Sequence, residues 1–215
     1  MIQDNKIFAK VFLWMFIGLA ITFGIGFYVS MNEIMLYNVF SKCYIWLIIA
    51  ELVVVIWLSA RIRKMSSTAA KIMFCIYSFL TGLTFSSIFV IYQLTSIIFV
   101  FGITSILFLI FALIGYFTNI DLSKIGIYLA MILLGIIICS IINIFVKSEI
   151  FDLTLTIICL VLFIIYIAYD IQIIKRNFYL IESEDNLAIY GALQLYLDFI
   201  NIFLKLLRLF GKNRD

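Results

Sequence analysis

The segment Gly191–Arg208, GALQLYLDFINIFLKLLR, is the stretch that decides the fold. On an α-helix, residues three or four positions apart share a face. The polar and small residues of this segment follow that spacing, whereas the other positions are Leu, Ile, Phe, Tyr or Ala. The face consists of Gly191, Gln194, Asp198, Asn201, Lys205 and Arg208. The sequence therefore predicts a helix with one polar stripe on an otherwise apolar surface.

This helix belongs to a chain suited to a bilayer rather than to water. Of its 215 residues, 66% are hydrophobic and 13% are charged, and apolar runs of about 20 residues recur along it, which is the length that crosses a membrane. An ionisable side chain inside a bilayer costs several kcal/mol unless it faces protein or water. We therefore expect the stripe to face inward, with other helices around it. A helix lying flat on the membrane is the alternative, but such helices carry mostly Lys and Arg on the polar face.

The apolar runs predict an all-α fold class: a polytopic membrane protein of seven transmembrane helices, with the last helix central. We expect one membrane domain over residues 1–215, beginning with a short cytoplasmic arm at residues 1–10 and with a loop at residues 32–42. The predicted spans cover residues 11–31, 43–60, 72–92, 97–117, 125–146, 151–174 and 188–210.

The distribution of Lys and Arg predicts the orientation, because these residues gather on the cytoplasmic side of membrane proteins. With a cytoplasmic N-terminus, the inner segments hold nine cations, namely Lys6, Lys10, Arg61, Arg63, Lys64, Lys71, Lys124, Lys175 and Arg176. The outer segments before the last helix hold only Lys42 and Lys147. We therefore expect a cytoplasmic N-terminus. Seven full spans put the cations of the chain end outside, whereas a re-entrant last segment would keep them inside, and we favour seven spans because residues 188–210 are long enough to cross.

Composition excludes several classes of function. The chain has no histidine, and its four cysteines, Cys43, Cys75, Cys139 and Cys159, lie far apart. A zinc site of the usual spacing is therefore excluded, and hydrolases that depend on a Ser-His pair are disfavoured. No basic patch for nucleic acid is present. We expect no enzymatic activity, no bound cofactor and no nucleic-acid partner.

Two acids inside the predicted spans are the main functional candidates. Asp170 lies near the inner end of the sixth span, and Asp198 lies in the seventh. At 1.5 Å per residue both fall about 6–10 Å inside the membrane, and the short connection makes their helices neighbours. Two carboxylates that meet in a low dielectric share one proton, while a doubly ionised pair offers oxygen ligands to a hard cation such as calcium. The alternative is that each acid pairs with a cation such as Arg61, Arg63 or Lys175.

The segments ALQLYLDFINIFLKLLRLFG and AYDIQIIK resemble the C-terminal signature of the Bax inhibitor-1 family, the transmembrane Bax inhibitor motif proteins, in its bacterial YccA-like branch. ELVVVIWLSARIRKMS and SFLTGLTFSSIF resemble the second and third helices of that family. The resemblance implies a protein of the bacterial inner membrane in which an Asp dyad, here Asp170 and Asp198, regulates a pH-sensitive calcium leak and binds calcium transiently. It also implies a gating arginine, here Arg61 or Arg63, and an intramembrane ion pair between Glu51 and Arg208.

Two functions fit this resemblance. The first is a calcium leak channel that is gated by protonation of the dyad, with calcium as the permeant ion rather than a cofactor. The second is a regulatory membrane protein without transport activity, which binds a membrane-anchored AAA protease or another membrane partner. The expected partners are the lipid bilayer, calcium ions and, in the second case, the protease. One departure from the family is the acidic connector IESED at residues 181–185.

Overall fold

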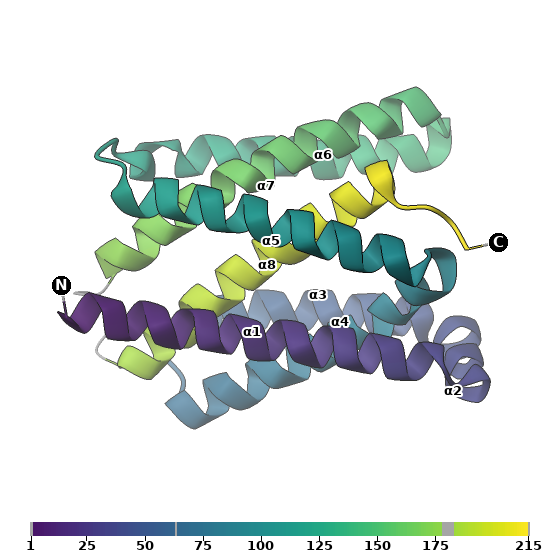
Figure 1. Ribbon diagram of the computed structural model, residues 1–215, viewed down its shortest axis with the longest axis horizontal. Helices are drawn as coiled ribbons and strands as arrows, with labels where there is room; N and C mark the ends of the chain where they lie inside the picture. The colour runs from purple at the N-terminus through teal and green to yellow at the C-terminus, as the bar shows by residue number, and fades with distance from the viewer. Residues whose placement is uncertain (1, 63, 178–182, 215) are drawn as a thin grey trace. The chain divides into compact units, whose positions relative to one another are not determined.

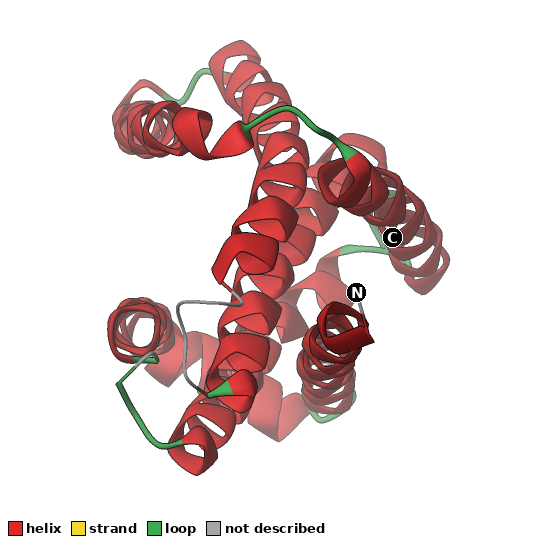
Figure 2. Cartoon of the chain, turned by 90° about the vertical axis from the view of Figure 1, so that its left-hand side faces the viewer, coloured by secondary structure: helices red, strands yellow, loops and turns green. Residues whose placement is uncertain are grey.

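The computed structural model describes residues 2–62, 64–177 and 183–214. Seven helices are long and apolar enough to cross a membrane, and the described residues contain no strand, which confirms the all-α membrane fold. The helices and their short connections can be followed in Figures 1 and 2. The seven are α1 (Ile2–Ser30), α3 (Tyr44–Arg61), α4 (Ser67–Ile91), α5 (Leu94–Phe117), α6 (Gly126–Val146), α7 (Glu149–Asn177) and α8 (Glu184–Phe210).

Two predicted irregular segments are instead helical. α1 begins at Ile2, so residues 2–10 belong to the first helix rather than to a separate arm. The predicted loop at residues 32–42 contains α2 (Glu33–Asn38), followed by a π-helical turn at Val39–Cys43. The Asn32 side chain caps α2 by accepting a hydrogen bond from the Met35 amide, and Glu33 stands at its positive end. The chain has no proline to interrupt these helices.

The chain divides into two compact units, and α8 contributes to both. The first unit holds α1 to α4, the part of α8 up to Tyr196, and the chain end from Lys212. The second holds α5 to α7 and the part of α8 from Leu197. α8 is the most buried of the seven long helices, as expected for a helix surrounded by others.

In the first unit, α1 and α4 pack closely along small residues. The Thr22 hydroxyl of α1 donates to the Ser78 carbonyl of α4 at 3.0 Å. A side chain at Gly82 of α4 would meet the Thr22 carbonyl at 3.0 Å and the Ile25 side chain at 2.8 Å. The absence of a side chain at this position therefore lets the two backbones approach, as in many membrane helix pairs.

The two ends of α8 are fixed at opposite ends of α4. Near its start, the Asn186 amide donates to the Met65 carbonyl, just before α4, at 2.7 Å. Beyond its last residue, the backbone of Lys212 accepts a hydrogen bond from the Gln93 amide, just after α4, at 2.9 Å. The backbone amide of Arg214 donates to the Ile91 carbonyl at 2.8 Å. The start of α8 and the chain end after it are therefore held at opposite ends of α4, which favours seven full spans; the re-entrant alternative for the last segment stays untested.

In the second unit, α7 holds the connection between α5 and α6. The Gln172 side chain accepts a hydrogen bond from the Leu122 amide at 2.7 Å and donates to the Ile120 carbonyl at 2.8 Å. Leu122 opens a 3-10 turn that leads into α6. On the other side of α8, Phe199 packs against the Phe101 ring of α5 with the ring centroids 5.2 Å apart. Gln172 and Phe199 each lie near one residue of the candidate site, on α7 and on α8 respectively.

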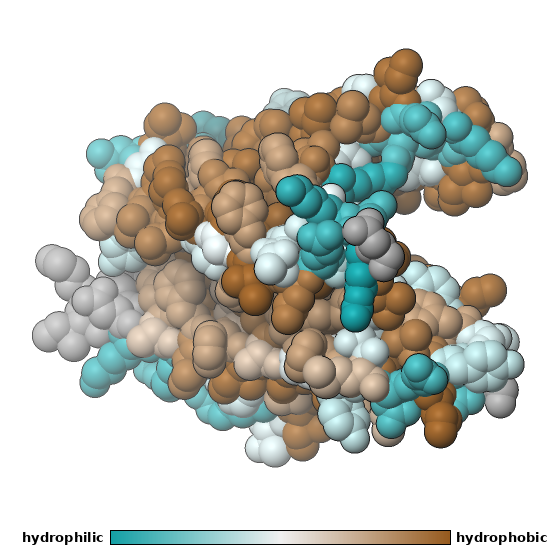
Figure 3. Space-filling view, turned by 45° about the vertical axis from the view of Figure 1, so that its right-hand side comes forward, coloured by the Kyte–Doolittle hydropathy of each residue, from teal (hydrophilic) through white to brown (hydrophobic). Residues whose placement is uncertain are grey.

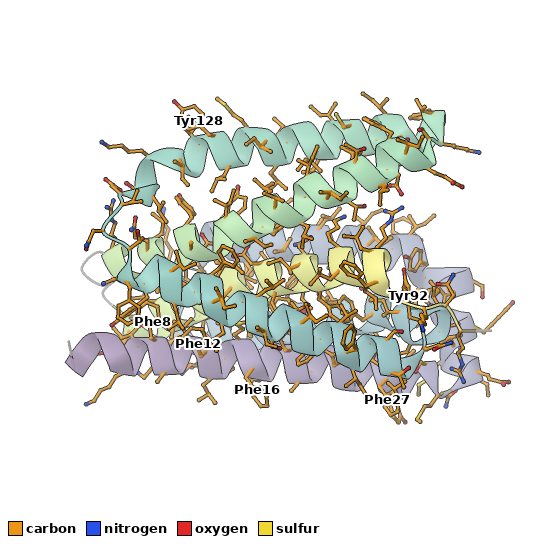
Figure 4. All side chains as sticks on the ribbon, turned by 45° about the horizontal axis from the view of Figure 1, so that its top comes forward. Phe8, Phe12, Phe16, Phe27, Tyr92 and Tyr128 are labelled. Carbon is orange, nitrogen blue, oxygen red and sulfur yellow. The ribbon has the colours of Figure 1, made fainter. Side chains whose placement is uncertain are left out.

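The outward surfaces of the helices are apolar. Large hydrophobic side chains are exposed along all seven long helices except α8, where Phe210 alone is exposed, and apolar residues cover much of the face in Figure 3. Phe16 of α1 is 69% exposed and Tyr128 of α6 is 63% exposed, and both point away from their helices into the surroundings in Figure 4. Exposed apolar surface of this extent is not compatible with a water-soluble monomer, whereas lipid tails solvate it.

Candidate functional site: an intramembrane carboxyl pair

Asp170 and Asp198 meet in the second unit. Each side chain belongs to a residue that is only 3% exposed, and the two carboxyl groups lie close enough for a hydrogen bond between them. Because an ionised carboxylate can only accept hydrogen bonds, such a bond requires a proton on one of the two. The Oδ2 atom of Asp198 is buried and has no hydrogen-bond partner among the described residues. The structure thus brings together the two acids that the sequence singled out, with one oxygen still free to bind a proton or cation.

The surroundings of the pair are mostly apolar. Ile167 and Ile171 of α7 and Ile202 of α8 are at most 1% exposed. Tyr166, one turn before Asp170, is close enough for its phenol to interact with both carboxyl groups. Among the described residues, neither acid forms an ion pair. A charge on this pair is therefore poorly compensated, so its protonation state matters for the packing of α7 against α8.

The cations proposed as alternative partners lie elsewhere or belong to the first unit. The Lys175 ammonium stands 4.6 Å from the centre of the Tyr116 ring and donates to the Tyr116 carbonyl at 3.2 Å. Arg61 is exposed at the end of α3, in the first unit. Arg63 lies outside the described residues. The gating role of Arg61 or Arg63 therefore stays a prediction.

A surface ion pair lies at the C-terminal end of α7. Arg176 lies 2.6 Å from the carboxylate of Asp121 and also donates to the Ser123 hydroxyl at 2.6 Å. Hydrogen bonds from Ser123, and then from Arg176, hold the pKa of the exposed Asp121 carboxyl below its ordinary value. Arg176 is thus occupied by Asp121 and Ser123, at the end of the helix beyond Asp170.

Glu51 and Arg208 each have a partner within their own unit. Hydroxyl groups of α4 donate to the Glu51 carboxylate, Thr81 at 2.8 Å and Thr84 at 3.3 Å. Arg208 forms an ion pair with Asp152 at the start of α7. The predicted pairing of Glu51 with Arg208, for which Lys205 is the second candidate, would join the two units and stays a prediction.

A double-mutant cycle decides between these partners of Arg208. Because Arg208 is paired with Asp152, the variants Asp152→Asn and Arg208→Met should show a coupling energy of about 1 kcal/mol, a value kept small by the partial solvent exposure of both side chains. Glu51→Gln, which keeps an oxygen acceptor for both threonines, should show little coupling to Arg208→Met. Thermal unfolding of the single and double variants in one detergent measures both energies. A larger coupling for Glu51 than for Asp152 would restore the pairing that the resemblance implies.

A charged cluster at the start of α8 was not predicted from the sequence. Asp185 lies 2.5 Å from the Lys71 ammonium of α4 and 3.3 Å from the Lys10 ammonium of α1. Glu184 also contacts Lys10, at 3.2 Å. These two acids end the IESED connector, of which residues 181–182 lie outside the described residues. The sequence did contain a signal for this cluster, because the connector before α8 is unusually acidic and the segment between the second and third predicted spans is rich in cations.

Calcium binding at the carboxyl pair stays a prediction. In the described part of the chain, no group of three or more Cys, Asp or Glu residues is placed to hold a metal ion. Calcium takes six to eight oxygen ligands, and two carboxylates supply at most four oxygen atoms. A calcium ion at Asp170 and Asp198 would keep much of its water, which is appropriate for transient binding.

Comparison with known proteins agrees with this architecture. The family model described as "Inhibitor of apoptosis-promoting Bax1" matches residues 4–215. The inner membrane protein YbhL of Escherichia coli is 42% identical over 213 residues, which cover 96% of this chain and 91% of YbhL. A protein of Borreliella burgdorferi is 40% identical, with 98% of this chain and 94% of the relative covered, and one of Deinococcus radiodurans is 35% identical, with 99% and 93% covered. From these matches and its seven apolar helices, the chain is a membrane protein that belongs to the Bax inhibitor-1 family.

Proposed function

We propose that the protein is a pH-sensitive calcium leak channel in which the Asp170–Asp198 pair is the gate. The observation that carries this proposal is the meeting of two buried carboxyl groups on different helices, close enough to share a hydrogen bond. Such a bond exists only while one proton is held. The gate is therefore a contact between α7 and α8 that depends on proton concentration.

Loss of the shared proton would change the contact from attraction to repulsion. Two unit charges about 4 Å apart repel by about 4 kcal/mol at an effective dielectric constant of about 20. The two helices must then separate, or a cation must enter between the carboxylates. Both outcomes favour cation passage, so the leak should be small at low pH and should increase as the pH rises. Calcium is favoured because carboxylate oxygens are its usual ligands.

The proposed setting is the bacterial inner membrane with a cytoplasmic N-terminus. The relative YbhL is named as an inner membrane protein, and the Lys and Arg residues of the chain predict the orientation. In this orientation the end of α7, two turns beyond Asp170, lies toward the cytoplasm, so the pair would respond to cytoplasmic pH.

Calcium uptake into liposomes containing only this protein tests the proposal. Flux is measured between about pH 5 and pH 8 for the unaltered protein, Asp170→Asn and Asp198→Asn. An asparagine keeps the shape of a protonated Asp and cannot ionise, so both variants should show low flux that no longer rises with pH. Asp121→Asn, which removes an exposed acid of the same unit, should keep the original profile.

Two outcomes would contradict the proposal. If both dyad variants keep the pH dependence of the unaltered protein, the pair is a structural contact only. If the unaltered protein gives no flux above that of empty vesicles, the regulatory alternative gains support. For that alternative, binding of a membrane-anchored AAA protease would be the next measurement.

A further inference from the structure

A line of polar residues continues from the carboxyl pair along the contact between α7 and α8. At one end of this line Asp170 meets Asp198, and at the other end Asp152 meets Arg208. These two cross-helix contacts show that the polar faces of the two helices look toward each other. We call this line the α7–α8 seam; its residues are Asp152, Thr156, Cys159, Tyr166 and Asp170 of α7 and Asp198, Asn201, Lys205 and Arg208 of α8.

Lys205 lies on this seam between the two contacts. It is two helical turns beyond Asp198, which corresponds to about 10 Å along the axis, and it is only partly exposed. Its charge acts on the thiol of Cys159, which belongs to α7 and is 5% exposed. Lys205 shares its helix face with Asp198 and Arg208, which both contact α7, so it lies on the side of α8 that faces α7.

The charge of Lys205 is not neutralised within the described residues. No carboxylate there forms an ion pair with it, and it has no hydrogen-bond partner there. Asp152 is the nearest acid of the seam toward the C-terminal end of α8, and it is already paired with Arg208. The acids on the other side, Asp170 and Asp198, bond to each other. An unpaired ammonium on an inward-facing stripe is costly in a membrane and calls for a functional explanation.

We propose that the α7–α8 seam is the path of the leak and that Lys205 is the residue that sets its rate and its ion preference. This inference rests on the proposed leak function. A cation that leaves the carboxyl pair along the seam must pass the fixed positive charge of Lys205. Coulomb repulsion is proportional to the charge of the passing ion, so Lys205 retards calcium more strongly than potassium. The acidic pair attracts the divalent ion, and Lys205 keeps its passage slow.

Ion fluxes in liposomes test the role of Lys205. Calcium and potassium fluxes are compared for the unaltered protein, Lys205→Gln and Lys205→Arg. We expect Lys205→Gln to increase calcium flux about tenfold and potassium flux by less, because repulsion scales with ion charge, while Lys205→Arg keeps the original ratio. Lys175→Gln, which removes a cation that contacts Tyr116 at the other end of α7, should leave the ratio unchanged. Equal calcium-to-potassium ratios for Lys205→Gln and the unaltered protein would overturn the proposal.

Cys159 gives a second measurement that does not depend on flux. In a variant whose other three cysteines are serine, anionic and cationic methanethiosulfonate reagents are compared at Cys159. A reagent attracted by Lys205 reacts faster, so the anionic reagent should be favoured, and this preference should disappear in Lys205→Gln and persist in Lys205→Arg. If the two reagents react at equal rates while Lys205 is present, the charge of Lys205 does not act on the α7–α8 seam, and the proposal is overturned. A charge preference at Cys159 without any calcium flux would overturn the proposed function and leave the placement of the Lys205 charge on the seam supported.

Discussion

Replacing Gly115 by alanine should destabilise the protein by about 3 kcal/mol, because overpacking against a rigid neighbour costs about 1–3 kcal/mol and the clash here is with backbone. Gly115 is a buried residue of α5. A methyl group at this position would lie 2.5 Å from the carbonyl oxygen of Ala168 on α7 and 2.6 Å from its Cα atom. Backbone atoms cannot rotate away as a side chain would, so the two helices would have to separate. Thermal unfolding in detergent should show a midpoint lowered by roughly 10 °C.

Gly102 provides the matched control for this substitution. It lies on the same helix, and an added methyl group there would meet no atom within 4 Å. Gly102→Ala should therefore leave the protein as stable as before or stabilise it by about 0.5–1 kcal/mol through the better helix propensity of alanine. If Gly115→Ala unfolds at the same temperature as Gly102→Ala, the close contact between α5 and α7 does not exist in the folded protein.

Tyr196→Ala should be the other strongly destabilising change, by about 4 kcal/mol, the usual range for removing a buried aromatic ring. Tyr196 is fully buried, and its ring packs edge-on against Phe74 and Tyr77 of α4, with both centroid distances 5.8 Å. Its hydroxyl lies 2.6 Å from the Thr22 hydroxyl of α1. One side chain of α8 therefore holds two other helices of the first unit, and its loss leaves a cavity between all three.

Two further variants distinguish the contribution of the Tyr196 ring to stability from that of its hydroxyl and from the general effect of removing a tyrosine. Tyr196→Phe should cost only about 1 kcal/mol, because the ring contacts remain and one hydrogen bond is lost. Tyr128→Ala removes a tyrosine of α6 that is 63% exposed and should change the unfolding temperature little. The same unfolding assay ranks the three variants. A loss for Tyr196→Phe as large as that for Tyr196→Ala would mean that the hydrogen bond, and not the packing, holds the three helices.

The seven crossings were predictable because a bilayer admits few alternatives. In hydrocarbon every backbone group must bond internally, so each apolar run of sufficient length becomes a helix. The helix ends were less predictable. Residues 2–10 are polar enough to suggest an arm, yet α1 includes them, and Lys10 is held there by Glu184 and Asp185. Such contacts depend on segments far apart in the sequence, which a local pattern does not reveal.

In the candidate site, too, some features were predictable from the sequence and others were not. Asp170 and Asp198 stood out because ionisable residues inside apolar spans are rare and costly, and their meeting follows from two neighbouring helices. The partners of the other charged residues could not be predicted from the sequence. Arg208 pairs with Asp152 because of the rotation of α7, and two hydroxyl groups of α4 donate to Glu51; neither contact was expected from the sequence. The hydroxyl groups of α4 gave no warning of this role, because serine and threonine in a membrane helix usually bond back to helix carbonyls.

The backbone pairing between the chain end and the turn after α4 has a practical consequence for reporter fusions. Lys212 bonds to Gln93, just after α4, and Arg214 bonds to Ile91, the last residue of α4, while the start of α8 bonds to Met65, just before α4. A protein fused to the C-terminus therefore emerges on the membrane face opposite to the loop between α3 and α4. If that loop is cytoplasmic, a C-terminal green fluorescent protein exported unfolded will stay dark, and alkaline phosphatase at the same position will be active. Purification tags placed there need a spacer that leaves the paired backbone undisturbed.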